Sequence, residues 1–154
     1  APNAKTIFTY IPTSAIAWMR RRMPDLVNLI FKNSVAYLKA MKVIHKNVAN
    51  LAKLTWPDLV VLDGYYCMDG NGPIDGFNVK LEAAVASTDP LKADGVGARL
   101  MGILPEDIGY LYYLKNDGFG DCSLSGLVGE DVEHVKKIFK MHPTYKIQKN
   151  WHID

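Results

Sequence analysis

The fold expected of this chain is decided by the stretch Asp58-Leu-Val-Val-Leu-Asp-Gly-Tyr-Tyr-Cys-Met-Asp-Gly-Asn-Gly-Pro-Ile-Asp-Gly76. Nothing alternates in the apolar run Leu59–Leu62, which predicts a strand buried on both faces. This strand delivers Asp63-Gly64 at its carboxyl end, where open α/β sheets place their ligands. In the Asp69–Pro73 turn that follows, two glycines permit backbone conformations that let a ligand approach the main chain. The stretch therefore predicts a site but names no ligand.

Composition describes an ordinary globular chain of one-domain size. The 154 residues are 49% hydrophobic and 22% charged, which suffices for a sizeable core. The formal charge of +2 is too small to imply a nucleic-acid partner, so none is expected. Cys67 and Cys122 have no metal-binding spacing and cannot supply the four thiolates of an iron–sulfur cluster. We expect no such cluster, and a reducing, cytoplasmic compartment.

No membrane contact is expected either. The most apolar long segment, Leu26 to Ile44, is interrupted by Lys32, Lys39 and Lys42. The chain opens at Ala1-Pro2 without an initiator methionine or signal peptide, as if within a protein. We therefore expect residues 1–154 to form a single α/β domain that is a fragment of a longer protein.

The first half reads as a strand and helices. Lys5–Ile11 is rich in β-branched and aromatic residues and predicts a short strand, and Ser14–Met23 predicts a helix. From Leu26 to Leu54 apolar residues recur at helical spacing, which fits one long helix or two with a break near Asn33-Ser34. Trp56-Pro57 ends this pattern.

The second half alternates strands and helices. Asn78–Ala86 alternates in polarity and predicts a strand. Asp89 is expected as the N-cap of a helix that begins at Pro90 and stops at Gly102. Within this helix the small residues Ala93, Gly95, Gly97 and Ala98 predict a smooth face that lies close to a sheet or a ligand.

Three further elements are expected toward the carboxyl end. They are a helix from Pro105 to about Gly118, a short strand at Leu124–Val128 and a helix at Glu130–Phe139, whereas His142–Asp154 has no clear period. Together the elements predict an α/β fold of three layers. A mostly parallel sheet, with Leu59–Leu62 at its centre, would carry helices on both faces.

Several motifs together resemble the domain-of-unknown-function family 362. They are Leu-Val-Val-Leu-Asp-Gly64, Met68-Asp-Gly-Asn-Gly-Pro73, Ser87-Thr-Asp-Pro90, Lys92-Ala-Asp94 and Ala98-Arg-Leu-Met-Gly102. The resemblance is strong from about His45 to Gly129. Members are prokaryotic α/β proteins, some with a ferredoxin-like iron–sulfur segment, so the resemblance implies an iron–sulfur-associated family but no defined reaction. Near the start, Asn3 and Ile7 replace the lysine and histidine of the family pattern.

Four acids are candidates for the site. Asp63 ends a strand and needs a partner or ligand, or else bonds to amides of the next turn. Asp69 would join it around a hard divalent cation, or simply forms the turn. Asp89 is foremost a helix cap, and Asp94 lies among small residues where packing needs no acid. We predict a metal at Asp63 and Asp94, which should face one cavity.

The remaining ligand-binding candidates come from the turn and from the resemblance. The turn contributes Gly70, Asn71 and Gly72. The family pattern adds His45, otherwise a hydrogen-bonded structural histidine, and Lys5, otherwise a solvated lysine.

Two functions remain open at this point. The first is a site for a metal or polar small molecule at the carboxyl edge of the sheet. The second is a non-catalytic module that docks a redox or partner domain. If the chain is a fragment, some apolar surface or strand edge that the rest of the protein covers would be exposed, and this would favour a homo-oligomer.

Overall fold

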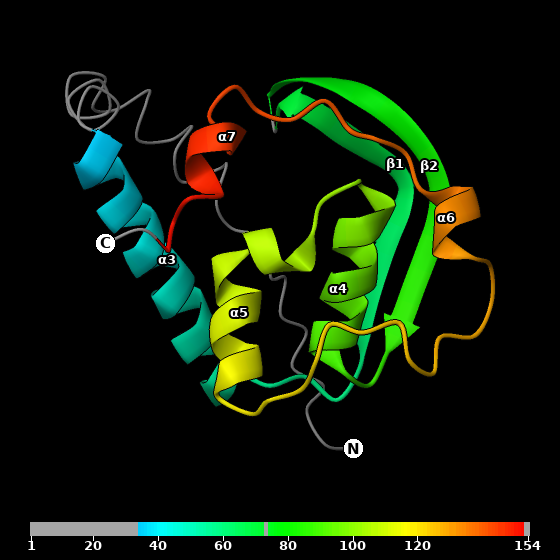
Figure 1. Cartoon of the computed structure of the whole chain (residues 1–154). Helices are drawn as coiled ribbons and strands as arrows, with labels where there is room; N and C mark the ends of the chain where they lie inside the picture. Colours follow the sequence, from blue (N-terminus) through cyan, green and yellow to red (C-terminus); the bar gives the residue numbers. More distant parts are fainter. Residues whose placement is uncertain (1–33, 73, 153–154) are drawn as a thin grey trace.

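A computed structural model describes residues 34–72 and 74–152, so the strand predicted at Lys5–Ile11 and the helix predicted at Ser14–Met23 lie outside the described residues. The described elements, in chain order, are α3 (Ser34–Leu54), β1 (Val60–Asn71), β2 (Asp75–Ser87), α4 (Pro90–Leu100), the 3-10 helix η1 (Pro105–Asp107), α5 (Gly109–Asn116), α6 (Val132–Val135) and α7 (Tyr145–Gln148). The curved β1–β2 hairpin wraps around α4, and α5 and α3 follow on the other side of α4 (Figure 1).

The sheet is an antiparallel hairpin, so the predicted three-layer, mostly parallel sheet is wrong. Among the described residues β1 pairs only with β2, from Val60 opposite Ser87 to Asn71 opposite Asp75. Only residues 72–74 connect the strands, whereas a parallel pair needs a crossover of a dozen residues or more. The glycine-rich stretch is thus the tip of a hairpin.

The run Leu59–Leu62 is not a central strand buried on both faces. Leu62 points toward α4, where its Cδ1 atom lies 2.9 Å from the place that a Cβ on Gly97 would take. Leu59 and Val61 are 61% and 63% exposed. An uninterrupted apolar run hides the alternation of a strand with one covered face, and this is why the prediction failed.

A β-bulge bends the hairpin. Gly64 pairs with Ala83 and Tyr66 with Lys80, so two residues of β2 oppose the single residue Tyr65. One of the two, Glu82, has a φ of 59° and is the only non-glycine among the described residues with a positive φ. Bulges of this kind increase the local twist and bend the strand, in keeping with the curvature around α4.

The helix predictions around α3 and α4 are confirmed where the chain is described. The helix α3 begins at Ser34 and ends at Leu54, before Trp56-Pro57. Asp89 caps α4, because its Oδ1 atom accepts hydrogen bonds from Leu91 N at 2.9 Å and Lys92 N at 3.3 Å. Gly102 follows α4 with a φ of 76°, which suits glycine after a helix.

The smooth face of α4 is also confirmed. A Cβ on Gly95 would stand 2.8 Å from the Cβ of Cys122 and 2.9 Å from its carbonyl oxygen. Ala93 and Ala98 are 0% and 2% exposed. The chain at Cys122 therefore lies too close to α4 for a larger side chain at Gly95, and Ala93 and Ala98 are also closely covered.

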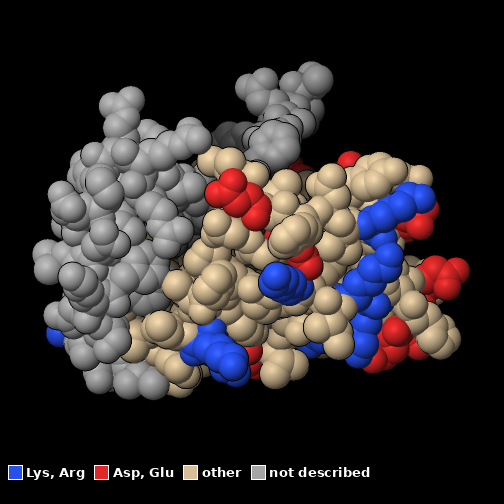
Figure 2. All heavy atoms as spheres, turned by 90° about the horizontal axis from the view of Figure 1, so that it is seen from above, with Lys and Arg blue, Asp and Glu red and all other residues tan. Residues whose placement is uncertain are grey.

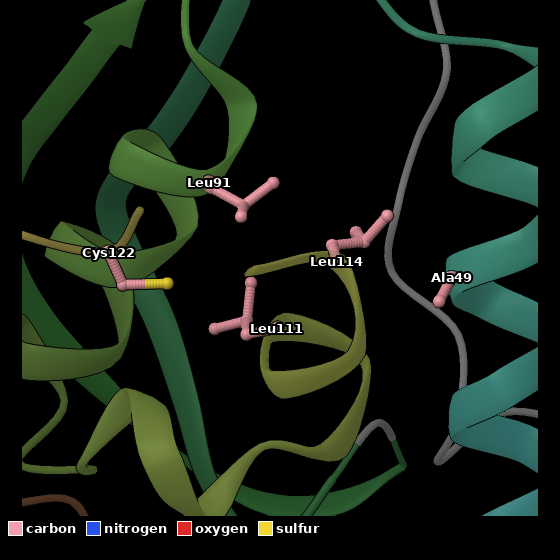
Figure 3. Close-up of a cluster of buried hydrophobic side chains, with 5 residues drawn as sticks. All are labelled: Ala49, Leu91, Leu111, Leu114 and Cys122. Carbon is pink, nitrogen blue, oxygen red and sulfur yellow. The ribbon is translucent and has the colours of Figure 1, made fainter. Parts of the chain in front are cut away.

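The core lies on both sides of α4. One cluster, between α3, α4 and α5, is shown in Figure 3 and consists of Ala49, Leu91, Leu111, Leu114 and Cys122. The second, between α4, the hairpin and α6, consists of Leu81, Val96, Leu100 and Val132. The helix predicted from Pro105 is observed as η1 followed by α5.

The carboxyl-terminal third departs from the predictions. Residues 124–128 form no strand, and of the helix predicted at 130–139 only α6 is present. Residues 136–142, here called the strap, instead run extended from α6 over the end of α4 to the hairpin tip. Lys137 N donates to Leu100 O at 2.9 Å, Phe139 N to Met101 O at 3.2 Å, and Gly70 N to Lys140 O at 2.6 Å. Seen from above, basic and acidic side chains lie next to one another on this side of the molecule (Figure 2).

The close approach of α4 leads to a paired prediction. In an open helix, glycine to alanine gains about 1 kcal/mol. We expect Gly95→Ala instead to lower the free energy of unfolding by about 2 kcal/mol, because the new methyl meets the backbone of Cys122. The matched variant Gly97→Ala meets only the end of the Leu62 side chain, which can move, and should stay within about 1 kcal/mol of the original protein. Urea unfolding measures both, and equal values would contradict the account.

Candidate functional site

A small cavity lies where α3, α4, α5 and the start of β1 meet. Its volume is about 40 Å³, enough for one to three water molecules. Most of its wall is apolar, and the groups with polar side-chain atoms are Thr55, Trp56, Asp94 and Tyr110. The complete lining is Val48, Ala52, Thr55, Trp56, Pro57, Val60, Pro90, Leu91, Asp94, Tyr110 and Leu114.

Asp94 and Tyr110 form a partly buried polar pair at this cavity. The Tyr110 hydroxyl donates a hydrogen bond to Asp94 Oδ2 at 2.9 Å. Burial raises the pKa of Asp94 to about 6, although the hydrogen bond from Tyr110 pulls it down. Burial, together with the negative charge of Asp94, raises the pKa of Tyr110 well above its usual value. Asp94 can therefore exchange a proton near neutral pH while Tyr110 remains a hydrogen-bond donor.

His45 packs near Tyr110 of this pair but is not among the residues that line the cavity. Its ring covers Gly109, where a Cβ would stand 2.5 Å from the ring, so only glycine fits. The ring centroid lies 6.4 Å from that of Tyr110 and 5.7 Å from that of Trp151. Burial lowers the pKa of His45 to about 4, which keeps the imidazole neutral at physiological pH.

The other predicted acids lie elsewhere. Asp63 is exposed on the sheet face opposite Leu62, and its Oδ1 atom accepts a hydrogen bond from Tyr65 N at 2.9 Å. Asp89 serves as the cap of α4. Asp69 Oδ2 accepts from Lys140 N at 2.9 Å. Each of these carboxylates thus accepts a hydrogen bond from a backbone N–H, and of the four predicted acids only Asp94 lines the cavity.

The predicted metal site finds no geometric support. Asp63 is not among the residues that line the cavity of Asp94. Within residues 34–72 and 74–152 no group of three or more His, Cys, Asp or Glu side chains is placed to hold a metal ion. Ligand binding by the predicted residues stays a prediction, and Lys5 lies outside the described residues.

The glycine-rich turn holds the strap in this structure. Gly70, with a φ of 75°, donates its N–H to Lys140 O, and Asn71 Oδ1 lies 2.9 Å from His142 Nε2. Thr144 N donates to His142 Nδ1 at 3.2 Å, so Nε2 carries the proton that reaches Asn71. Asp69 Oδ1 is buried without a protein partner among the described residues. Gly72 packs against the Met68 side chain.

Sequence reasoning missed Tyr110, Trp56 and Thr55. Tyr110 is separated from Asp94 by 16 positions and lies in an apolar helix, where an aromatic residue reads as core. Trp56 and Thr55 read only as the end of a helix. No local pattern could have placed these groups around Asp94, because four elements, α3, α4, α5 and the start of β1, have to meet to form the cavity.

The fold and site together define an α+β arrangement of the described residues, with a bent antiparallel hairpin covered on one face by helices and an ionisable carboxyl at a small cavity. The chain belongs to the family described as domain of unknown function (DUF362), whose family model matches residues 3–99. No curated protein and no solved structure matches the chain.

The predicted family is thereby confirmed, with a different span from the one expected. The match runs from Asn3 through the hairpin to Arg99 in α4, and therefore includes Asp94 but stops before Tyr110. It also covers the start of the chain, where Asn3 and Ile7 depart from the expected pattern. The polar pair thus joins one residue inside the matched region to one outside it.

In the part of the chain that the structure describes, no helix is long and apolar enough to cross a membrane.

The partly buried Asp94 and His45 give the stability pH dependences of opposite sign. Because the pKa of Asp94 rises from 3.8 to about 6 on folding, its contribution to stability falls as pH rises from about 4 to 6. Because the pKa of His45 drops from 6.5 to about 4, its contribution rises over about pH 4 to 6.5. Each effect is worth about 3 kcal/mol at most. In the original protein the two should largely cancel between pH 4 and 6.

Single substitutions should separate the contributions of Asp94 and His45 to the stability. We expect the stability of Asp94→Asn to rise steadily from pH 4 to 6.5, and that of His45→Gln to fall from pH 4 to 6. Chemical unfolding at half-unit pH steps measures both profiles. The exposed Asp63→Asn serves as the matched control and should keep the flat profile. Parallel profiles for Asp94→Asn and His45→Gln would contradict the assignment.

The strap gives a separate prediction. In Asp69→Ala the Lys140 N–H loses its charged acceptor, which is worth about 1.5 kcal/mol. We expect the amides of Lys137, Phe139 and Lys140 to exchange with deuterium about tenfold faster. Asp75→Ala, at an exposed acid of the same hairpin tip, is the control and should leave their exchange unchanged. Unaltered exchange in Asp69→Ala would show that the turn does not hold the strap.

Proposed function

We propose that this DUF362 domain binds a polar small molecule at the Asp94 cavity, with the Asp94 carboxyl as the anchor. One observation carries the proposal. An ionisable carboxyl lines a cavity whose wall is otherwise largely apolar, and the hydroxyl of Tyr110 fixes its orientation. Strongly perturbed acids in such settings are frequent at ligand-binding and catalytic sites.

The chemistry favours a ligand with a positively charged group. Burial alone makes ionised Asp94 costly, as its raised pKa shows. A cation next to the carboxylate would offset this cost and draw the pKa back down. Tyr110 donates to Oδ2, so we expect the ligand group at Oδ1. Trp56 and Tyr110 also line the cavity, and a cation bound over either ring face would gain cation–π attraction.

The cavity suits an organic ammonium group better than a divalent metal. Mg²⁺ and Ca²⁺ need six or more oxygen ligands. The side chains of the lining offer one carboxylate and the hydroxyls of Thr55 and Tyr110. A volume of about 40 Å³ matches a small ammonium head, with any longer apolar part lying toward Trp56 and Leu114.

A non-catalytic docking module is the second candidate. The observation that favours it is the presence of large exposed apolar side chains on the outer side of the hairpin, including Val61 and Tyr66 at 63% and 68% exposed. The two candidates concern different faces of the domain and can be tested independently.

The test of the first candidate is a thermal-shift and calorimetric series. The probes are methylammonium, ethylammonium and butylammonium chlorides, with sodium, magnesium and calcium chlorides at matched ionic strength. We expect an alkylammonium ion to raise the melting temperature, and binding to tighten about tenfold from pH 5 to 7 as Asp94 ionises.

Matched variants make the result specific. Asp94→Asn should abolish the shift, Tyr110→Phe should weaken it, and Asp63→Asn should leave it intact. A shift that survives Asp94→Asn would refute the cavity as the binding site. A response to magnesium or calcium alone, lost in both aspartate variants, would return the site to the metal first expected.

A further inference from the structure

The face of the hairpin turned away from α4 is exposed and combines apolar with charged side chains. Cross-strand partners share a face, and this one carries Val61, Asp63, Tyr66 and Met68 of β1 opposite Ala86, Ala84, Lys80 and Asn78 of β2, with Glu82 at the bulge. We call these nine residues the outer sheet face. Val61, Tyr66 and Met68 are 63%, 68% and 41% exposed. Such a surface on a two-stranded sheet indicates an interaction site.

The arrangement of residues on this face is ordered along the strands. Small apolar side chains lie at one end, around Val61 and Ala86, and large ones at the other, around Tyr66 and Met68. Both signs of charge lie between them, where Lys80 Nζ contacts Glu82 Oε1 at 2.7 Å. The bulge marks the middle of the face.

We propose that the outer sheet face is the interface of a homodimer, in which a second copy packs face to face about a two-fold axis at the bulge. Such an axis, perpendicular to the strands, reverses their direction in the second copy. Lys80 then faces the partner's Glu82. Met68 faces the partner's Val61, and the Tyr66 hydroxyl faces the partner's Asp63. Each contact occurs twice, as a two-fold interface requires.

The pattern fits a second copy of this chain better than an unrelated partner. Six of the nine side chains have a complement on the same face: Met68 and Val61 as large against small, Lys80 and Glu82 as base against acid, and Tyr66 and Asp63 as hydroxyl against carboxylate. One two-fold axis can serve both strands. The proposed contacts of β1 are centred between Gly64 and Tyr65, and those of β2 are centred on Leu81. In the hairpin these two centres lie within about one residue of the same level along the strands. Two sheets stacked in this way also form a common aligned packing.

The test uses charge reversal on the full chain. Light scattering at high protein concentration should give the mass of a dimer. Lys80→Glu and Glu82→Lys should each give a monomer, since each places like charges across the interface. The double variant Lys80→Glu/Glu82→Lys should restore the dimer, because the pairs are re-formed with exchanged signs. Lys146→Glu, an exposed change on α7, is the control and should remain dimeric.

The outcomes separate cleanly. Circular dichroism melts establish that each variant is folded, and Val61→Asp gives a second route to the monomer that leaves the ion pair in place. A monomeric original protein overturns the proposal. So does a dimer that both single charge reversals leave intact, since another surface would then form the interface.

Discussion

The structure depends on the close approach that α4 makes on two sides. Gly95 lets the Cys122 backbone lie against the helix, and Gly97 admits the Leu62 side chain from the sheet. Larger side chains at these positions would push the layers apart, and both core clusters include residues of α4. The helix accepts two residues that weaken it locally because the packing that they permit stabilises the whole domain.

The same close packing creates the candidate site. Asp94 lies between Ala93 and Gly95, so the neighbours that approach the small residues also remove water from its carboxyl group. Tyr110 supplies the hydrogen bond that makes this burial tolerable. His45 packs nearby over Gly109, and partial burial shifts its pKa in the opposite direction from that of Asp94. The packing of α4 therefore places one ionisable carboxyl, that of Asp94, at a largely apolar cavity, and this suits the cavity to a positively charged ligand.

The glycine-rich turn shows how one motif can fit two explanations. Its two glycines and its acid predicted a ligand loop, yet in this structure its amide, carboxylate and side-chain amide hold the strap. Conformations that bring the main chain near a ligand serve equally well for a second segment of the same chain. Asp69 Oδ1 is the one atom of this joint that is left buried without a protein partner among the described residues.

Local order was determined by the sequence itself: the N-cap at Asp89, the end of α4 at Gly102, the β2 strand and the small-residue face follow from rules that act within a few residues. Strand direction was decided by tertiary structure, because the run Leu59–Leu62 reads alike in a central parallel strand and in a bent hairpin. The site was decided in the same way. Asp94 could be singled out from sequence, but its contact with Tyr110 and the cavity arise only where α3, α4, α5 and the start of β1 meet. The burial and the pKa of a side chain depend on the neighbours packed around it, which the residue alone does not determine.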